Sequence, residues 1–290
     1  MSGLSVSDII SELTWYDGLY KKAAVDAAIE QKDEVVPELI QRLIRILDDP
    51  YRYLKKKGYF LHVYASIILG HLKVKDAHEI IIALCSLPGE LSAALYGDIL
   101  NTDLPMVFLR TSGGDPKRIM ELVRDKEADL YCRDAALKAL MNGVIKNIFE
   151  RAMVLEFIGS LFTGEECEED SDFWSIVALH ANDLYPEEII DTIKQAYEKK
   201  LISPNFIDYE EFEHVLSNDR EEWLKTLLED PDENSFEDIH SVMEWWDCFN
   251  LDSIMARQQQ KKQVSPEDRK TKKKKKKMAA NSQRKNRKKK

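Results

Sequence analysis

Apolar residues recur at intervals of three and four along almost the whole chain. One stripe runs through residues 36–47, and a second occupies positions i, i+4, i+7, i+8 and i+11 of residues 61–72. This spacing places apolar side chains on one face of an α-helix. We find no convincing run with the period-two alternation of a half-buried strand. The pattern therefore predicts an all-α protein.

Helix-start signals agree with this pattern. Asp115 and Pro116 have the form of an N-cap followed by proline at the first helical position, and Pro186 precedes two acidic residues of a first turn. Asp219 and Glu222 have the spacing of a capping box. The expected helices cover residues 5–13, 19–31, 35–48, 59–72, 77–86, 91–100, 104–110, 116–126, 130–144, 148–162, 172–182, 187–200, 207–216, 219–229 and 236–256.

Most of these helices are 10 to 15 residues long with short connections, which favours antiparallel pairs. Residues 64–72 and 76–84 have the Ala…Leu-Gly helix, tight turn and second helix of a HEAT repeat, and residues 132–140 echo the first helix about 70 residues later. Small residues let helices approach closely, and each pair buries its open face against the next. We therefore expect a HEAT-like α-solenoid of antiparallel helix pairs, with a globular helical bundle as the alternative.

Composition excludes several classes of protein. Eleven glycines and nine prolines are few for an all-β fold or a Gly-rich cofactor cradle. No apolar run approaches the roughly 18 residues that cross a bilayer, and the N-terminus lacks the basic region of a secretory signal. The cysteines, at 85, 132, 167 and 248, are too far apart for a C-x-x-C motif. We expect a cytoplasmic protein with reduced cysteines and no membrane partner.

The net charge of −10 averages two opposite segments. Residues 261–290 hold 16 of the 42 basic residues and two acidic ones, so this segment carries +14 and residues 1–260 carry −24. We divide the chain into a HEAT-like repeat domain at 1–216, an acidic helical extension at 217–256 and a disordered basic tail at 257–290. An acidic body repels phosphate polymers, so contact with nucleic acid would come through the tail.

The tail is the most distinctive segment, because like charges at this density oppose a compact state. It is expected to be an electrostatic arm for RNA, ribosome or DNA phosphates, without sequence preference. The alternatives are that it folds back on the acidic body or aids solubility. The candidate residues are Lys272, Lys273, Lys274, Lys275, Lys276, Lys277, Arg284, Lys285, Arg287, Lys288, Lys289 and Lys290.

Four motifs, in this order, resemble a bacterial family known as domain of unknown function 1186. They are residues 97–100, residues 131–140, Trp174 with Pro186–Glu187, and residues 201–207. The resemblance covers residues 5–215 and implies a HEAT-like solenoid without an established activity. Many relatives end in a Cys-rich SEC-C zinc motif, but residues 251–290 contain neither Cys nor His. A zinc role of that motif does not transfer to this chain.

Candidate chemistry is sparse. His78–Glu79 is a single His-Glu pair, whereas HEAT proteins resembling deoxyhypusine hydroxylase bind iron with several. Gly113–Gly114 could hold an anion, but an inter-helix turn is favoured because no Lys-Ser/Thr follows. Residues 165–172 hold six carboxylates without the ligand spacing of a calcium loop, which favours a solvated loop. We expect no catalytic residue, no cofactor and no metal.

Aromatic residues provide the other candidate sites, because aromatic side chains often anchor protein interfaces. Trp15, Tyr16, Trp245 and Trp246 are the candidate partner-binding residues, whereas Trp174 lies on an apolar stripe and is expected in the core. The favoured function is a non-enzymatic interaction scaffold with an unidentified protein partner. The alternative is an RNA- or ribosome-associated factor tethered by the tail. A HEAT-like base-excision glycosylase is disfavoured by the acidic body.

Overall fold

The computed structural model describes residues 3–168, 171–228 and 236–250. In these residues the regular elements are helices, and pairing between extended segments is limited to isolated bridges such as that between Trp15 and Tyr59. The predicted all-α class is therefore confirmed. No helix in the described part of the chain combines the length and apolar character needed to cross a membrane.

The N-terminal half of the described chain contains short and medium helices. These are α1 (Val6–Thr14), α2 (Lys22–Glu30), α3 (Lys32–Asp48), α4 (Pro50–Leu54), α5 (Leu61–His71), η1 (Lys75–Ala77), α6 (His78–Cys85), α7 (Leu91–Tyr96), α8 (Ile99–Thr102) and α9 (Leu104–Thr111). The later helices are α10 (Lys117–Arg124), α11 (Leu130–Ile145), α12 (Arg151–Gly159), α13 (Phe173–Asp183), η2 (Glu187–Ile189), α14 (Ile190–Glu198), α15 (Tyr209–Leu216), α16 (Arg220–Leu228) and α17 (Ile239–Met243).

Backbone contacts divide the chain into two units. The first comprises residues 1–17 and 21–242, and the second comprises residues 18–20 and 243–290. The predicted domain boundaries at residues 217 and 257 stay predictions, and the predicted disordered tail at 257–290 lies outside the described residues.

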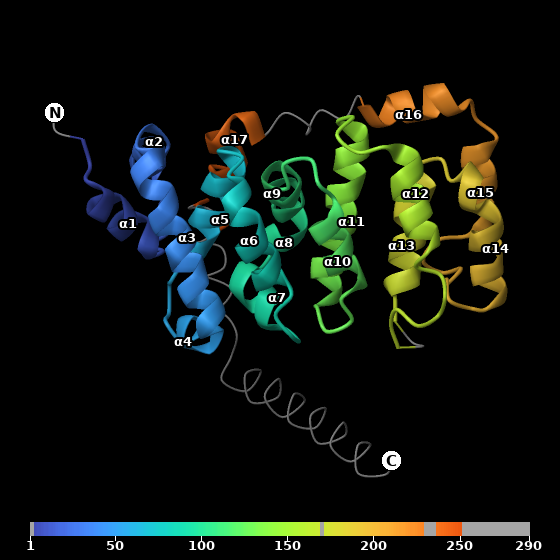
Figure 1. Cartoon of the computed structure of the whole chain (residues 1–290), viewed down its shortest axis with the longest axis horizontal. Helices are drawn as coiled ribbons and strands as arrows, with labels where there is room; N and C mark the ends of the chain where they lie inside the picture. The colour runs from blue at the N-terminus through green and yellow to red at the C-terminus, as the bar shows by residue number, and fades with distance from the viewer. Residues whose placement is uncertain (1–2, 169–170, 229–235, 251–290) are drawn as a thin grey trace, which may run out of the picture. The chain divides into compact units, whose positions relative to one another are not determined.

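Within the first unit, the helices pack mainly on neighbours in the sequence. Helix α3 packs on α5, α5 on α9, α9 on α11, α11 on α13 and α13 on α15. The helices from α1 to α15 follow one another in chain order across Figure 1. Helix α6 packs on α3 and on α10, and α10 packs on α11.

Small residues permit this packing at two positions. A Cβ atom added to Gly70 on α5 would lie 2.9 Å from Val107 Cγ2 on α9, and one added to Gly143 on α11 would lie 2.0 Å from a Phe149 ring carbon. Both separations are below a normal carbon–carbon contact. The glycine of the Leu-Gly motif therefore allows the close helix approach that its sequence context predicts.

One turn geometry ends three of the helices. Lys73, Asn147 and Lys200 adopt positive φ values of 55°, 54° and 59°. The next N–H in each case donates to a carbonyl five residues earlier, as in the bond from Val74 to Leu69 O at 3.0 Å. This pattern is the Schellman motif, which satisfies carbonyl groups at a helix C-terminus. It brings the loops after α5, α11 and α14 to the same local shape.

Two expected helices differ from the structure. The helix expected at 91–100 is broken into α7 and α8, because Gly97 between them has a φ of +57°. The helix expected at 236–256 is limited, among the described residues, to Ile239–Met243. Residues 244–250 form turns instead, and there the Trp246 and Phe249 rings stack 5.9 Å apart. Aromatic contact outweighs helix propensity in this segment.

Candidate interaction surfaces

Trp15 and Tyr16 lie in a short extended segment after α1. The Tyr16 N–H donates to Gly58 O at 2.7 Å, which pairs this segment with the chain before α5. The Trp15 ring meets Tyr59 edge-on at 5.8 Å, yet Trp15 remains 51% exposed and Tyr16 36% exposed. We call these two residues the Trp15–Tyr16 patch, an aromatic surface held by backbone hydrogen bonds.

Trp245 and Trp246 lie in the second unit and differ in their exposure. Trp245 is 81% exposed, whereas Trp246 is half-buried and stacks on Phe249. Phe249 in turn contacts Tyr20 at 5.6 Å between ring centroids. One tryptophan therefore supports the local fold, and the other presents an aromatic side chain to solvent.

The tail residues Lys272–Lys277, Arg284–Lys285 and Arg287–Lys290 lie outside the described residues. Their assignment to nucleic-acid or anion binding stays a prediction. It rests on charge alone.

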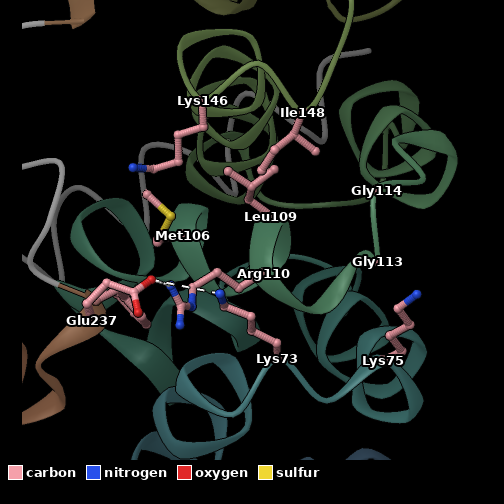
Figure 2. Close-up of a pocket in the computed structure, with 11 residues that line it drawn as sticks. Lys73, Lys75, Met106, Leu109, Arg110, Gly113, Gly114, Lys146, Ile148 and Glu237 are labelled. Carbon is pink, nitrogen blue, oxygen red and sulfur yellow. Dashed lines mark hydrogen bonds and ion pairs between the residues drawn. The ribbon is translucent and has the colours of Figure 1, made fainter.

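The structure contains a basic pocket of about 320 Å³ that the sequence pattern did not predict (Figure 2). It lies in the first unit, where loops after successive helices converge, and we call it the Arg110 pocket. Its basic lining residues are Lys73, Lys75, Arg110 and Lys146; its other lining residues are Met106, Leu109, Gly113, Gly114, Ile148, Phe236 and Glu237. A local positive cluster of this kind contrasts with the net charge of −24 in residues 1–260.

Arg110 from α9 is largely enclosed, with 10% of its side chain exposed. Its Nε and Nη2 atoms donate to the carbonyls of Gly70 and His71 at the end of α5, each at 3.0 Å. Its Nη1 atom donates to Glu237 Oε1 at 2.7 Å (Figure 2). The hydrogen bond and the positive charge of Arg110 lower the pKa of the Glu237 carboxyl. The guanidinium thus joins two helices and one carboxylate.

The sequence signal for this pocket is the regular interval between three of its basic residues. Lys73, Arg110 and Lys146 are 37 and 36 residues apart, close to the length of one helix pair. Gly113 and Gly114 form the turn after α9 with φ values of +66° and +90°, and the Lys75 side chain lies across Gly113. These glycines therefore form the inter-helix turn between α9 and α10 that the sequence favoured over an anion site.

Arg151 from α12 makes an equivalent set of contacts further along the chain. It donates from Nε to Leu184 O at 2.7 Å and from Nη2 to Tyr185 O, at the end of α13. Both of its terminal nitrogens also bind Glu188, Nη1 at 2.6 Å and Nη2 at 2.8 Å. Like Arg110, this side chain links a helix C-terminus to a carboxylate. We call each arrangement a guanidinium clamp.

Arg133 and Asp134 of the 131–140 motif stabilise the packing of α11. Arg133 is 1% exposed, donates to Val123 O at 2.7 Å and lies 3.7 Å from the centre of the Phe173 ring. Asp134 accepts from His180 at 2.7 Å. Burial raises the pKa of Asp134, but the bonds from His180 and Lys138 outweigh it, so that the pKa is lowered. These contacts join α11 to α13.

Two buried histidines and two buried cysteines have partners within the core. His62 is fully enclosed with Nε2 2.6 Å from Leu95 O, and desolvation lowers its pKa to about 4. His78 pairs with Thr111 at 2.9 Å. Cys85 and Cys132 meet in the core, where burial raises the pKa of the Cys85 thiol. Buried thiols with a raised pKa are poor nucleophiles.

The acidic segment 165–172 is partly accounted for by local bonds. Glu166 accepts from Thr163 Oγ1 at 2.6 Å and from the Trp174 indole at 3.1 Å, and Trp174 is buried as expected. Within the described residues, no group of three or more His, Cys, Asp or Glu side chains is arranged to hold a metal ion.

In the described residues the fold is all-helical, and two partly buried arginines bind carbonyl groups at the C-terminal ends of helices. The chain belongs to the family described as "Protein of unknown function (DUF1186)", whose model matches residues 4–250. This confirms the resemblance seen in the sequence motifs.

Two relatives from Chlamydia show the same extent of similarity. A protein of Chlamydia muridarum is 25% identical over 245 residues, which cover 84% of this chain and 97% of the relative. A protein of Chlamydia trachomatis serovar D is 26% identical over 244 residues, which cover 84% of this chain and 96% of the relative. Both carry the description "Uncharacterized protein". No solved structure matches this chain.

Proposed function

We propose that this protein is a non-enzymatic interaction scaffold built on successive helix pairs of the HEAT-like kind. The observation that carries the proposal is the order of packing in the first unit, where α5 contacts α9, α9 contacts α11, and α11 contacts α13. An arrangement in which a repeat contacts only its neighbours leaves extended surfaces open for partners.

The Trp15–Tyr16 patch is the proposed partner-binding surface of the first unit. Exposed aromatic side chains on a fixed backbone lose little conformational entropy when a partner covers them. The backbone bond from Tyr16 to Gly58 and the ring contact of Trp15 with Tyr59 support this role. Trp245 is the corresponding candidate in the second unit.

The test is quantitative affinity purification of the full chain from a lysate of the source organism, at low and high salt. Replacement of Trp15 and Tyr16 by Ala should remove at least one partner that full-length protein retains at high salt. The matched control is Tyr131→Ala, which removes another exposed aromatic residue, on α11. Equal partner sets for the two variants would contradict the proposed role of the patch.

The second candidate is an RNA- or ribosome-associated factor tethered by its basic tail, favoured by the +14 charge of residues 261–290. Phosphate contacts by Lys and Arg make such binding strongly dependent on salt. Replacement of Lys272–Lys277 by Gln should remove co-sedimentation with polysomes. Unchanged sedimentation would exclude this function and leave the scaffold proposal intact.

A further inference from the structure

The Arg110 pocket is occupied on one side by a segment distant in the sequence. Phe236 is buried, its carbonyl oxygen lies 3.2 Å from His71 Nδ1, and its ring lies 5.8 Å from the Arg110 guanidinium carbon. Glu237 reaches Arg110 at 2.7 Å and Lys73 at 3.8 Å. His71 and Arg110 therefore contact the carbonyl group, the aromatic ring and the carboxylate of two consecutive residues.

The rest of this segment lies along the first unit as well. Ile239 and Val242 are buried, and His240 lies 2.7 Å from Asp26 on α2. These contacts place the segment against α2 and α5, whereas Trp223 of α16 donates to Asp183 O at the end of α13 at 3.0 Å. We call residues 236–242 the internal segment. It returns to helices that precede it by more than a hundred residues.

The pocket continues beyond Glu237. Its remaining walls combine Lys75 and Lys146 with the apolar side chains of Met106, Leu109 and Ile148 (Figure 2). Basic groups around an apolar floor complement a carboxylate side chain next to an apolar one. The unfilled volume of about 320 Å³ is enough for one or two further side chains of a bound peptide.

The Arg151 clamp shows what distinguishes this site. Glu188, the carboxylate of that clamp, is 37 residues from its arginine and belongs to the next helix pair. Glu237, the carboxylate of the Arg110 clamp, is 127 residues from its arginine. The carboxylate that binds Arg110 thus comes from a distant segment and not from the neighbouring helices. The charge and shape of the side chains, and not closeness in the chain, determine this contact.

We propose that the Arg110 pocket is a docking site for an acidic peptide of a partner protein in which an aromatic residue precedes a glutamate. The internal segment is the tethered occupant with which this peptide competes. The inference rests on the proposed scaffold function and names a partner class for a second surface. A tethered ligand acts at an effective concentration of about millimolar, so it lowers the apparent affinity of a free peptide.

The test uses the full-length protein and a fluorescent peptide with the sequence of residues 235–243, which carries the proposed chemistry. Phe236→Ala combined with Glu237→Gln removes the ring and the carboxylate with which the internal segment occupies the Arg110 pocket, and we call this the released variant. This released variant should bind the peptide about 10-fold more tightly than the wild type, the gain expected if the segment fills roughly nine-tenths of the sites. Anisotropy titration measures the affinity.

Two changes test the recognition itself. Replacement of Glu by Gln at the third position of the peptide should weaken binding about 10-fold while leaving the protein untouched. Arg110→Lys in the released variant should have a similar effect, and Arg151→Lys in the same background should have none. Thermal melting of each variant shows whether it is folded, and the altered peptide decides the question if Arg110→Lys is not.

The proposal is overturned if the released variant and the wild type bind the peptide equally, if the altered peptide binds as well as the original, or if Arg151→Lys matches Arg110→Lys. It is also overturned if the wild type is a dimer that the released variant cannot form, because a second copy is then the occupant. None of these results concerns the Trp15–Tyr16 patch, so failure here leaves the scaffold proposal standing.

Discussion

The two guanidinium clamps share a geometry but differ in the origin of their carboxylates. Arg110 and Arg151 each donate to two carbonyl groups at the end of a helix, α5 and α13 respectively. Arg151 is completed by a nearby glutamate with two bonds, and Arg110 by a remote glutamate with one. The first arrangement is local, and the second depends on the return of the internal segment.

This comparison assigns a stabilising role to the arginine–carbonyl bonds and a recognition role to the carboxylate. A helix C-terminus leaves carbonyl groups without intrahelical partners, and an arginine that binds them stabilises the junction between two helix pairs. That part is common to both clamps. The carboxylate is the variable part, because it is exposed and can be exchanged. Side-chain exposure is 43% for Glu188 and 67% for Glu237.

The largest expected effect comes from removing the arginines. Arg110→Ala and Arg151→Ala should each reduce the free energy of unfolding by about 2–4 kcal/mol, because enclosed carbonyls lose hydrogen bonds to a charged donor. Urea denaturation measures the difference. The control is Arg118→Ala, whose arginine binds the exposed carboxylates of Glu79 and Glu121. It should cost about 1 kcal/mol or less, and an equal cost would contradict the clamp interpretation.

Removing the carboxylates should have a smaller effect and should distinguish the clamps. Glu188→Gln should cost about 1 kcal/mol and Glu237→Gln about half of that, since the more exposed pair is better screened. Urea denaturation at 0.05 M and about 1 M NaCl measures both, with the Glu237→Gln cost becoming negligible at high salt. A larger cost for Glu237→Gln than for Glu188→Gln would reverse the proposed order.

A still smaller difference in stability is expected between substitutions in the two turns beside the Arg110 pocket. Lys73 and Asn147 both have left-handed φ values, a conformation that asparagine tolerates better than lysine. Lys73→Gly should therefore stabilise the protein by roughly 0.5 kcal/mol, and Asn147→Gly should have almost no effect. Thermal unfolding of the two variants checks this. Equal gains would show that residue type at these turns is unimportant.

The smallest effect is a pH dependence that NMR can assign to each clamp. Hydrogen bonds from Arg151 and Arg110 lower the pKa values of Glu188 and Glu237 from 4.5. The unfolded chain then binds more protons in acid, so this stabilisation is present above pH 4.5 and is lost as the pH falls through the folded pKa values.

Carboxyl titration of the Arg110→Ala variant should return the pKa of Glu237 toward 4.5 and leave that of Glu188 lowered. The unaltered Glu188 serves as the internal control. A lowered Glu237 pKa that survives loss of Arg110 would assign the shift to Lys73, the other cation within 4 Å.

Local patterns in the sequence predict most of the helices. The apolar stripe at 61–72 became α5, and the Asp219 carboxylate accepts from the Glu222 N–H at 3.0 Å as its spacing predicts. Helix α4 was missed although Pro50 opens it and Asp49 caps it. It has only five residues, too few for an apolar stripe to repeat.

The pocket could not be predicted in the same way. Its basic residues come from separate loops, and each one alone resembles an ordinary solvated lysine or arginine. The interval between Lys73, Arg110 and Lys146 is a signal only once the length of a helix pair is known. No neighbouring residue in the sequence indicates the role of Glu237, because its partner is 127 residues away.

By itself, the sequence determined that this protein is helical, that small residues allow some of its helices to approach closely, and that it belongs to its family. These features depend on neighbours within a few turns or on the order of motifs. The tertiary structure alone decided which carboxylate meets which guanidinium. Pairing of charges depends on distance in space, and the folding of the helix pairs sets that distance.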